Sequence, residues 1–138
     1  MVKLGFLSVV FLASLFSGCS VPEKKPTTFH YLSPYAVQNN MQLMADELAH
    51  IALIILDDKP SGAERRQQIL PMLDRIEIIA ATLAGEDEVV TNYSVINHYM
   101  GAFLYDVGVA RQFAQREPAN LIPAGRLIKS CMSCHESI

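Results

Sequence analysis

Residues 87–116 read DEVVTNYSVINHYMGAFLYDVGVARQFAQR, and their apolar side chains recur at alternating intervals of four and three residues. This spacing places them on one face of an α-helix, because 3.6 residues complete a helical turn. The stripe consists of Val89, Tyr93, Ile96, Met100, Phe103, Val107, Ala110 and Ala114. We therefore expect a helix from about Asp87 to Arg116, whose continuous apolar face needs another helix as its partner.

Three other segments show the same helical periodicity, and Pro, Gly, Asp and Asn lie between them. The first runs from about Pro34 to Leu56. The second follows a Ser-x-x-Glu capping box at residues 61–64, contains Pro71, where we expect a kink or a restart, and ends near Gly85. The last follows Asn120. Their stripes are Met41, Met44, Leu48, Ile51 and Ile55, then Ile69, Leu73, Ile76, Ala80 and Leu83, then Leu121, Ala124, Leu127, Ile128 and Cys131.

The connections between these four long helices are short, which favours antiparallel neighbours. No stretch shows the strict alternation of apolar and polar residues that a half-buried strand requires. The predicted fold is all-α: an up-down-up-down antiparallel four-helix bundle in one domain, residues 34–138.

The N-terminal segment has the features of an export signal. One positive charge precedes an apolar run from Leu4 to Phe16, which is too short to span a bilayer comfortably. Residues 15–19, LFSGC, resemble the bacterial lipobox, in which the signal is removed before a cysteine that receives lipid. We expect a signal peptide at 1–18, a lipid on Cys19 and a polar tether over 19–33. Ordinary cleavage that leaves Cys19 as a free thiol is the alternative.

These features place the domain on the periplasmic side of a bacterial membrane, held by its lipid anchor only, with the inner or outer membrane left open. Removal of the signal takes away Lys3 and no other charge, which changes the formal charge from −3 to −4. An acidic domain offers no electrostatic footprint for nucleic acid. The acidity favours a partner protein with a basic patch.

The last helix carries Cys131-Met132-Ser133-Cys134-His135. Cysteines three residues apart on a helix project near one edge, so both sulfurs reach the vinyl groups of one haem, and the next residue binds the iron from the same side. The motif predicts one covalent haem c, held by Cys131 and Cys134, with His135 as the proximal iron ligand. A thiol–disulfide exchange site, a zinc site and a structural disulfide are the alternatives.

A helical bundle with Cys-x-x-Cys-His on its C-terminal helix resembles the class II cytochromes c, the family of cytochrome c prime and its low-spin relatives. The resemblance covers about Tyr35 to His135, although only the haem motif itself is specific. In that family the first helix faces the open side of the haem. Matching Tyr35–Met44 to that helix implies Met41 as the distal iron ligand of a low-spin His/Met haem, with Met44 as the alternative. The alternative is that Met41 and Met44 only pack in the core, because both lie on the apolar stripe of the first helix.

This chain departs from the family pattern at the edges of the haem. Family members often carry an arginine for a haem propionate about one turn before the distal position, where this chain has Val37 and Gln38. Arg126, Lys129 or the second helix is the expected substitute. The chain also ends three residues after His135, so we expect an exposed haem edge.

The resemblance implies an electron carrier for redox partner proteins rather than an enzyme, and it allows a homodimer, because many relatives form one. The alternative is a five-coordinate protein that binds NO or CO as cytochrome c prime does, with Met41 near the iron but not bonded to it. A haem-free thiol-redox lipoprotein is the third hypothesis. The stripes place His50 and His98 on the surface, while Tyr93, Tyr99 and Phe103 are candidates for the pocket lining or the core.

Overall fold

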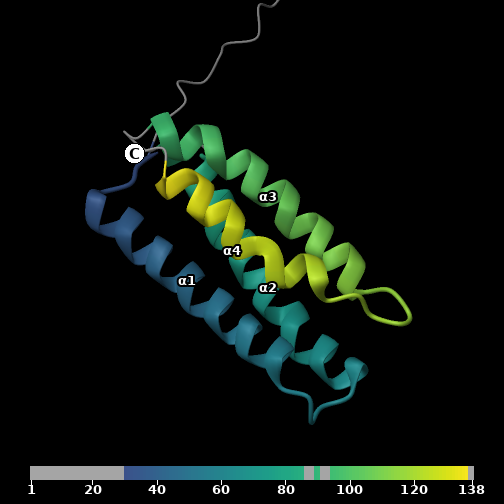
Figure 1. The fold of residues 1–138 in the computed structure, drawn as a ribbon. Coiled ribbons are helices and arrows are strands. Elements are labelled where there is room, and N and C mark those ends of the chain that lie inside the picture. Colours follow the sequence, from purple (N-terminus) through teal and green to yellow (C-terminus); the bar gives the residue numbers. More distant parts are fainter. Residues whose placement is uncertain (1–29, 86–88, 91–93, 137–138) are drawn as a thin grey trace, which may run out of the picture.

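The computed structural model describes residues 30–85, 89–90 and 94–136. Four helices pack against one another, and consecutive helices run in opposite directions (Figure 1). Their bounds are Pro34–Leu56 for α1, Gly62–Ala84 for α2, Ser94–Ala114 for α3 and Ile122–His135 for α4. The prediction of a four-helix architecture is therefore confirmed. The predicted signal peptide, Cys19 and all but the last residues of the predicted tether lie outside the described residues.

The first helix has the predicted bounds, which local chemistry explains. The Ser33 hydroxyl accepts a hydrogen bond from the Ala36 N–H at 3.1 Å and so caps α1. Pro34 stands in the first turn, where its missing N–H costs no helical hydrogen bond. Within the described part of the chain, no helix is long and apolar enough to cross a membrane.

The capping box predicted for the second helix is present. The Ser61 N–H donates to the Glu64 carboxylate at 2.7 Å, and the Glu64 N–H donates to the Ser61 hydroxyl at 3.2 Å. The hydrogen bond from the Ser61 N–H, and to a smaller extent the Ser61 hydroxyl, hold the pKa of the Glu64 carboxyl below its usual value. Gly85 ends the helix in the left-handed conformation, with φ at 85°.

Pro71 lies inside α2, which continues without interruption from Gly62 to Ala84, so the predicted restart is wrong. A proline lacks the N–H that would bond to the carbonyl four residues earlier, here Gln67. Both residues are exposed, so water has access to that carbonyl. Ile69 and Leu73, on the other face, are fully buried and hold the helix to the bundle.

The third helix begins later than predicted, at Ser94 rather than near Asp87. Val89–Val90 forms a short strand, β2, which pairs in parallel with β1, His30–Tyr31. Successive β-branched side chains disfavour a helix here, and the pairing partner comes from the far end of the described chain. Tyr93, expected on the stripe, lies outside the described residues.

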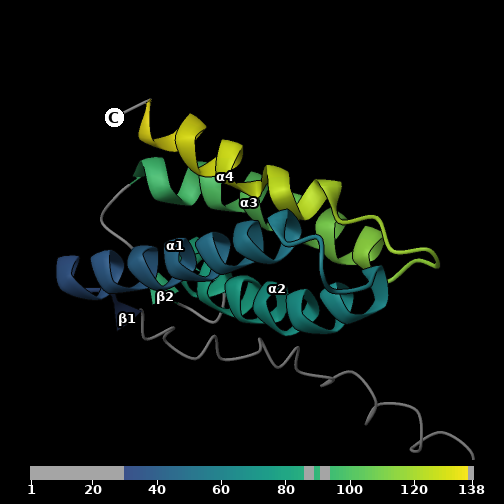
Figure 2. The same cartoon turned by 60° about the horizontal axis from the view of Figure 1, so that its bottom comes forward.

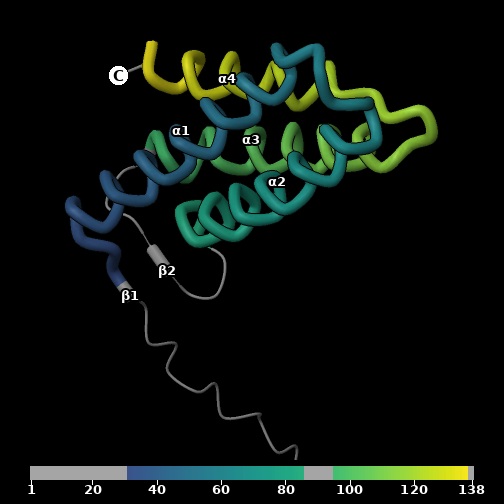
Figure 3. The backbone as a smooth tube through the Cα atoms, turned by 90° about the horizontal axis from the view of Figure 1, so that it is seen from below, coloured from purple at the N-terminus to yellow at the C-terminus, as the bar shows by residue number. Residues whose placement is uncertain are grey.

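The predicted stripes meet in one core between the four helices, except that Ile128, predicted on the stripe of the last helix, is 53 % exposed. α4 packs closely on α3 and only lightly on α1. Figures 2 and 3 show the four helices from the side, with α4 next to α3. Gly125 permits the contact between α4 and α1, because a Cβ at that position would lie 3.3 Å from the Ile55 Cδ1 atom. The buried core residues are Val37, Met44, Leu48, Ile51, Ile69, Leu73, Ile76, Ala80, Leu83, Ile96, Met100, Phe103, Val107, Ala110, Ala114, Ala124 and Leu127.

Candidate functional site

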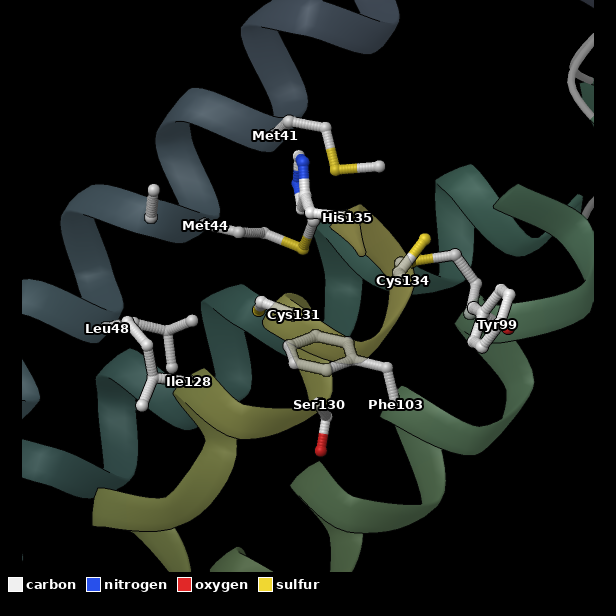
Figure 4. Close-up of a pocket in the computed structure, with 12 residues that line it drawn as sticks. Met41, Met44, Leu48, Tyr99, Phe103, Ile128, Ser130, Cys131, Cys134 and His135 are labelled. Atoms are coloured by element: carbon white, nitrogen blue, oxygen red, sulfur yellow. The ribbon is translucent and has the colours of Figure 1, made fainter. Parts of the chain in front are cut away.

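A cavity of about 90 Å³ lies between α1, α3 and α4, and α2 contributes no residue to its lining (Figure 4). It brings together the methionines that we predicted on the first helix and the Cys-x-x-Cys-His motif of the last helix. The lining consists of Met41, Met44, Ala45, Leu48, Tyr99, Met100, Phe103, Ile128, Ser130, Cys131, Cys134 and His135. The cavity is thus the candidate haem site.

The motif occupies the last turns of α4. The side chains of Cys131, Cys134 and His135 differ in how far they are buried. Cys134 is buried with 5 % of its surface exposed, and Cys131 is half-buried. His135 is the last residue of α4 and is exposed at the edge of the cavity. Figure 4 shows its imidazole extending from α4 toward α1. The spacing that predicted a common edge is therefore realised.

Met41 and Met44 face this motif from α1, and both line the cavity. Met44 is 3 % exposed and belongs to the core, whereas Met41 is half-buried and packs at its border. Figure 4 shows both thioether side chains reaching from α1 toward α4. The structure thus places both candidate distal ligands, and distinguishes them by burial.

The aromatic residues and histidines are arranged as the stripes predicted. Tyr99 and Phe103 both line the cavity from α3, and Phe103 is buried. His98 is exposed and meets the ring of Tyr99 edge-on, with 5.1 Å between ring centroids and 89° between ring planes. His50 is also exposed. Neither histidine lines the cavity, so neither belongs to the candidate site.

Burial raises the pKa of the Cys131 thiol, and the neighbouring Cys134 raises it further. A raised pKa keeps the thiol protonated, whereas the attacking cysteine of an exchange protein usually has a lowered pKa. The position of Cys131 in its helix also disfavours a lowered thiol pKa. Cys131 lies late in α4, near the negative end of the helix dipole, and an exchange cysteine is favoured at the positive N-terminal end. The surroundings therefore disfavour the thiol–disulfide exchange hypothesis.

One polar contact beside the motif was not found from the sequence. The Ser130 hydroxyl donates to the Asp106 carboxylate at 2.5 Å and links α4 to α3 directly before Cys131. Both residues are half-buried, where a hydrogen bond is screened less by water than at the surface. Residues 24 positions apart share no local sequence signal, so only the packing of the two helices reveals this pair.

The cations expected for the haem propionates are not part of this lining. Arg126 and Lys129 are exposed on α4 and line a second cavity of about 360 Å³ with Asp106, Phe113 and other α3 and α4 residues. The second helix contributes no lining residue either. The expected substitution for the family's arginine is thus not seen at the cavity wall.

The cavity combines two thiols and an imidazole on one helix with two thioethers on another, in apolar surroundings. This donor set suits haem, because thioether bonds hold the ring while nitrogen and sulfur ligands bind its iron. Among the residues that the structure describes, no three Cys, His, Asp or Glu side chains are grouped so as to hold a metal ion by themselves. Comparison of the chain with protein-family models, with curated proteins and with solved structures gave no match.

Proposed function

We propose that the chain is a monohaem c-type cytochrome that transfers electrons on the periplasmic side of a bacterial membrane. One observation carries the proposal: Cys131, Cys134 and His135 share one apolar cavity with Met41 and Met44 of the opposite helix. A bound haem supplies an iron centre that gains and loses one electron. The chain itself supplies attachment, axial ligands and an apolar environment.

In this proposal the two cysteines hold the haem through thioether bonds, and His135 binds the iron from the same helix. The raised pKa of Cys131 is compatible with this role, since a thioether carries no charge and suits half-buried surroundings. The Ser130–Asp106 hydrogen bond fixes α4 on α3 at the start of the motif. Attachment and proximal ligation therefore lie on a helix whose position is held.

Met41 is the proposed distal ligand, and Met44 supports it. Because Met44 is buried in the core, its side chain is committed to packing, whereas Met41 lies at the border of the cavity. A thioether ligand and an apolar wall both favour reduced iron, since neither compensates the additional charge of the ferric state. Phe103 and Leu48 provide part of that wall.

The volume of the cavity indicates where a haem would lie. The cavity of about 90 Å³ is smaller than the roughly 300–1,000 Å³ of most small-molecule sites. A haem would therefore also occupy the seam between α1 and α4, the neighbouring pair that packs most lightly. Filling this seam would join the two helices, so the haem-bearing protein should be more stable than the haem-free protein.

The exposed side of the site offers a route for electrons. His135 and Met132 are both exposed, so an edge of a haem held there would be accessible to another protein. The proposed lipid on Cys19 would keep the domain near membrane-bound redox partners. This arrangement needs no substrate chemistry, and the proposal does not include enzyme activity.

Absorption spectroscopy of the full chain, exported with a c-type haem maturation system, tests the proposal. A low-spin ferric spectrum with a methionine–iron charge-transfer band is the expected result, together with slow or absent carbon monoxide binding. A high-spin ferric spectrum with rapid binding of NO or CO would instead support the five-coordinate gas-binding protein. A colourless protein would contradict both hypotheses and favour the thiol-redox lipoprotein.

A further inference from the structure

The helices around the candidate haem site are uncharged where they form it. Residues 34–45 of α1, 94–105 of α3 and 130–135 of α4 contain no Asp, Glu, Lys or Arg, although 18 % of the whole chain is charged. These three stretches supply every lining residue of the cavity except Leu48 and Ile128. The absence of charge is therefore local to the site.

The charges are concentrated on another part of the bundle. Every ion pair between described residues has one partner on α2, the helix that does not line the cavity. The charged residues nearest to the motif in sequence are Lys129 and Glu136. The acidic residues 86–88 lie outside the described residues. Among the described residues, none that lines the cavity is Asp, Glu, Lys or Arg, and the acidic residues next to the lining in sequence are Asp46, Glu47 and Glu136.

Several exposed residues beside the cavity have apolar or amide side chains. Ile128 and Met132 of α4 are 53 % and 51 % exposed, and Ala45 of α1 is exposed while it lines the cavity. Gln38 is exposed and stands one turn before Met41 on the same face of α1. We call Gln38, Ala45, Ile128 and Met132 the uncharged rim. Depletion of charge and enrichment of Met are typical of the centres of protein interfaces.

We propose that the uncharged rim is the docking surface for the redox partner, and that the partner presents an uncharged face of apolar and amide side chains. The proposal rests on the proposed haem function. A basic patch on the partner would find no carboxylate among the side chains of the uncharged rim, and burial of unpaired charges is costly. The helix α2, which carries one partner of each ion pair, does not line the cavity, and salt screens exposed charges beyond about 10 Å at 0.1 M.

Electron transfer to small charged oxidants measures the charge at this surface. The reduced protein is mixed in a stopped-flow instrument with anionic hexacyanoferrate(III) or with cationic tris(phenanthroline)cobalt(III). Each oxidant takes one electron from the reduced protein, and no bond or proton changes. We expect both rates to change by less than about twofold between 0.1 and 1 M salt. A cation rate that falls with salt while the anion rate rises would show a negative docking surface and overturn the proposal.

Two matched variants test whether electrons leave the protein at the uncharged rim. Gln38→Lys adds one positive charge to the uncharged rim, whereas Gln68→Lys adds the same charge at an exposed position in the first turns of α2. For Gln38→Lys we expect the anion rate to fall about threefold or more between low and high salt, because salt screens the new attraction. Gln68→Lys should leave the salt dependence unchanged. Equal responses of the two variants would show that the rim is not the point of electron exit.

Electron self-exchange between oxidised and reduced molecules, followed by NMR line broadening, extends the test to two proteins that meet through uncharged faces. The wild-type rate should not depend on salt, although both molecules are acidic overall, and Gln38→Lys should slow the exchange at low salt. A wild-type rate that rises steeply with salt would overturn the proposal. Absence of haem from the purified protein would overturn the proposed function and this proposal together, whereas salt-dependent rates in a haem-bearing protein would overturn the docking surface alone.

Discussion

Alanine substitutions of the two cavity methionines should separate packing from iron ligation. Met44 is 3 % exposed and surrounded by core side chains, so Met44→Ala removes buried apolar surface and leaves a cavity. Substitutions of this kind cost about 2–5 kcal/mol. For a domain of this size, a loss of 2 kcal/mol corresponds to a fall in Tm of roughly 8–16 °C. Met41 is half-buried, so Met41→Ala should cost less than about 2 kcal/mol in the haem-free protein.

The spectroscopic expectation is the opposite. Met41→Ala removes the proposed distal ligand, so the ferric haem should become high-spin and bind carbon monoxide readily. Met44→Ala should keep the low-spin spectrum, because its side chain packs in the core and does not reach the iron in this proposal. Thermal melts followed by circular dichroism and ferric absorption spectra of both variants provide the comparison. A low-spin spectrum in Met41→Ala together with a high-spin spectrum in Met44→Ala would refute our assignment and identify Met44 as the ligand.

Three further predictions concern the framework around the site. Ser61→Ala should lower the free energy of unfolding by about 1 kcal/mol in a denaturant titration, because it removes the hydroxyl that accepts from the Glu64 N–H. The Ser61 N–H still donates to the Glu64 carboxylate, so the pKa of Glu64, measured by NMR, should rise only part of the way to its usual value. The lowered pKa of Glu64 stabilises the fold at pH values above the unfolded-state pKa, and this contribution disappears as the pH falls through the folded-state pKa. Ser61→Ala should therefore lose less stability between neutral and acidic pH than the wild type does. In haem-free Cys134→Ser protein, Cys131 should react slowly with iodoacetamide. Its reaction rate should rise only at a higher pH than that of a free thiol, because burial raises the Cys131 pKa. A reaction rate that rises at a lower pH than that of a free thiol would contradict this reasoning. Ser130→Ala should cost about 1–3 kcal/mol of unfolding free energy, since it leaves the half-buried Asp106 carboxylate without this donor, whereas Ser133→Ala, at an exposed position, should cost less; equal costs would show that the Asp106 contact is not stabilising.

The sequence predicted those parts of the structure that are determined locally. The capping box at Ser61 and the glycine at 85 mark helix ends through hydrogen bonds within one turn, so the bounds of α2 were predicted closely. Buried stripes such as Ile69, Leu73 and Ile76 follow from helical periodicity alone. The close arrangement of Cys131, Cys134 and His135 was predicted for the same reason, because their spacing fixes their positions on a helix.

The features that were missed depend on contacts between distant residues. Pairing of His30–Tyr31 with Val89–Val90 joins segments almost 60 positions apart and shortens the third helix at its start. The Ser130–Asp106 hydrogen bond and the separate location of Arg126 depend on how α4 rotates against α3. Periodicity shows which face of a helix is buried, but it does not show which neighbouring side chains that face meets.

Intact-mass spectrometry of the denatured protein tests the central claim, covalent haem at Cys131 and Cys134, most directly. The chain is produced with export and c-type maturation, unfolded, and measured beside a Cys131→Ser/Cys134→Ser variant. We predict that the wild-type mass exceeds that of the polypeptide by one haem after unfolding, and that the double variant carries no haem mass. A wild-type mass without haem, with both cysteines as free thiols or joined in a disulfide, would contradict the account.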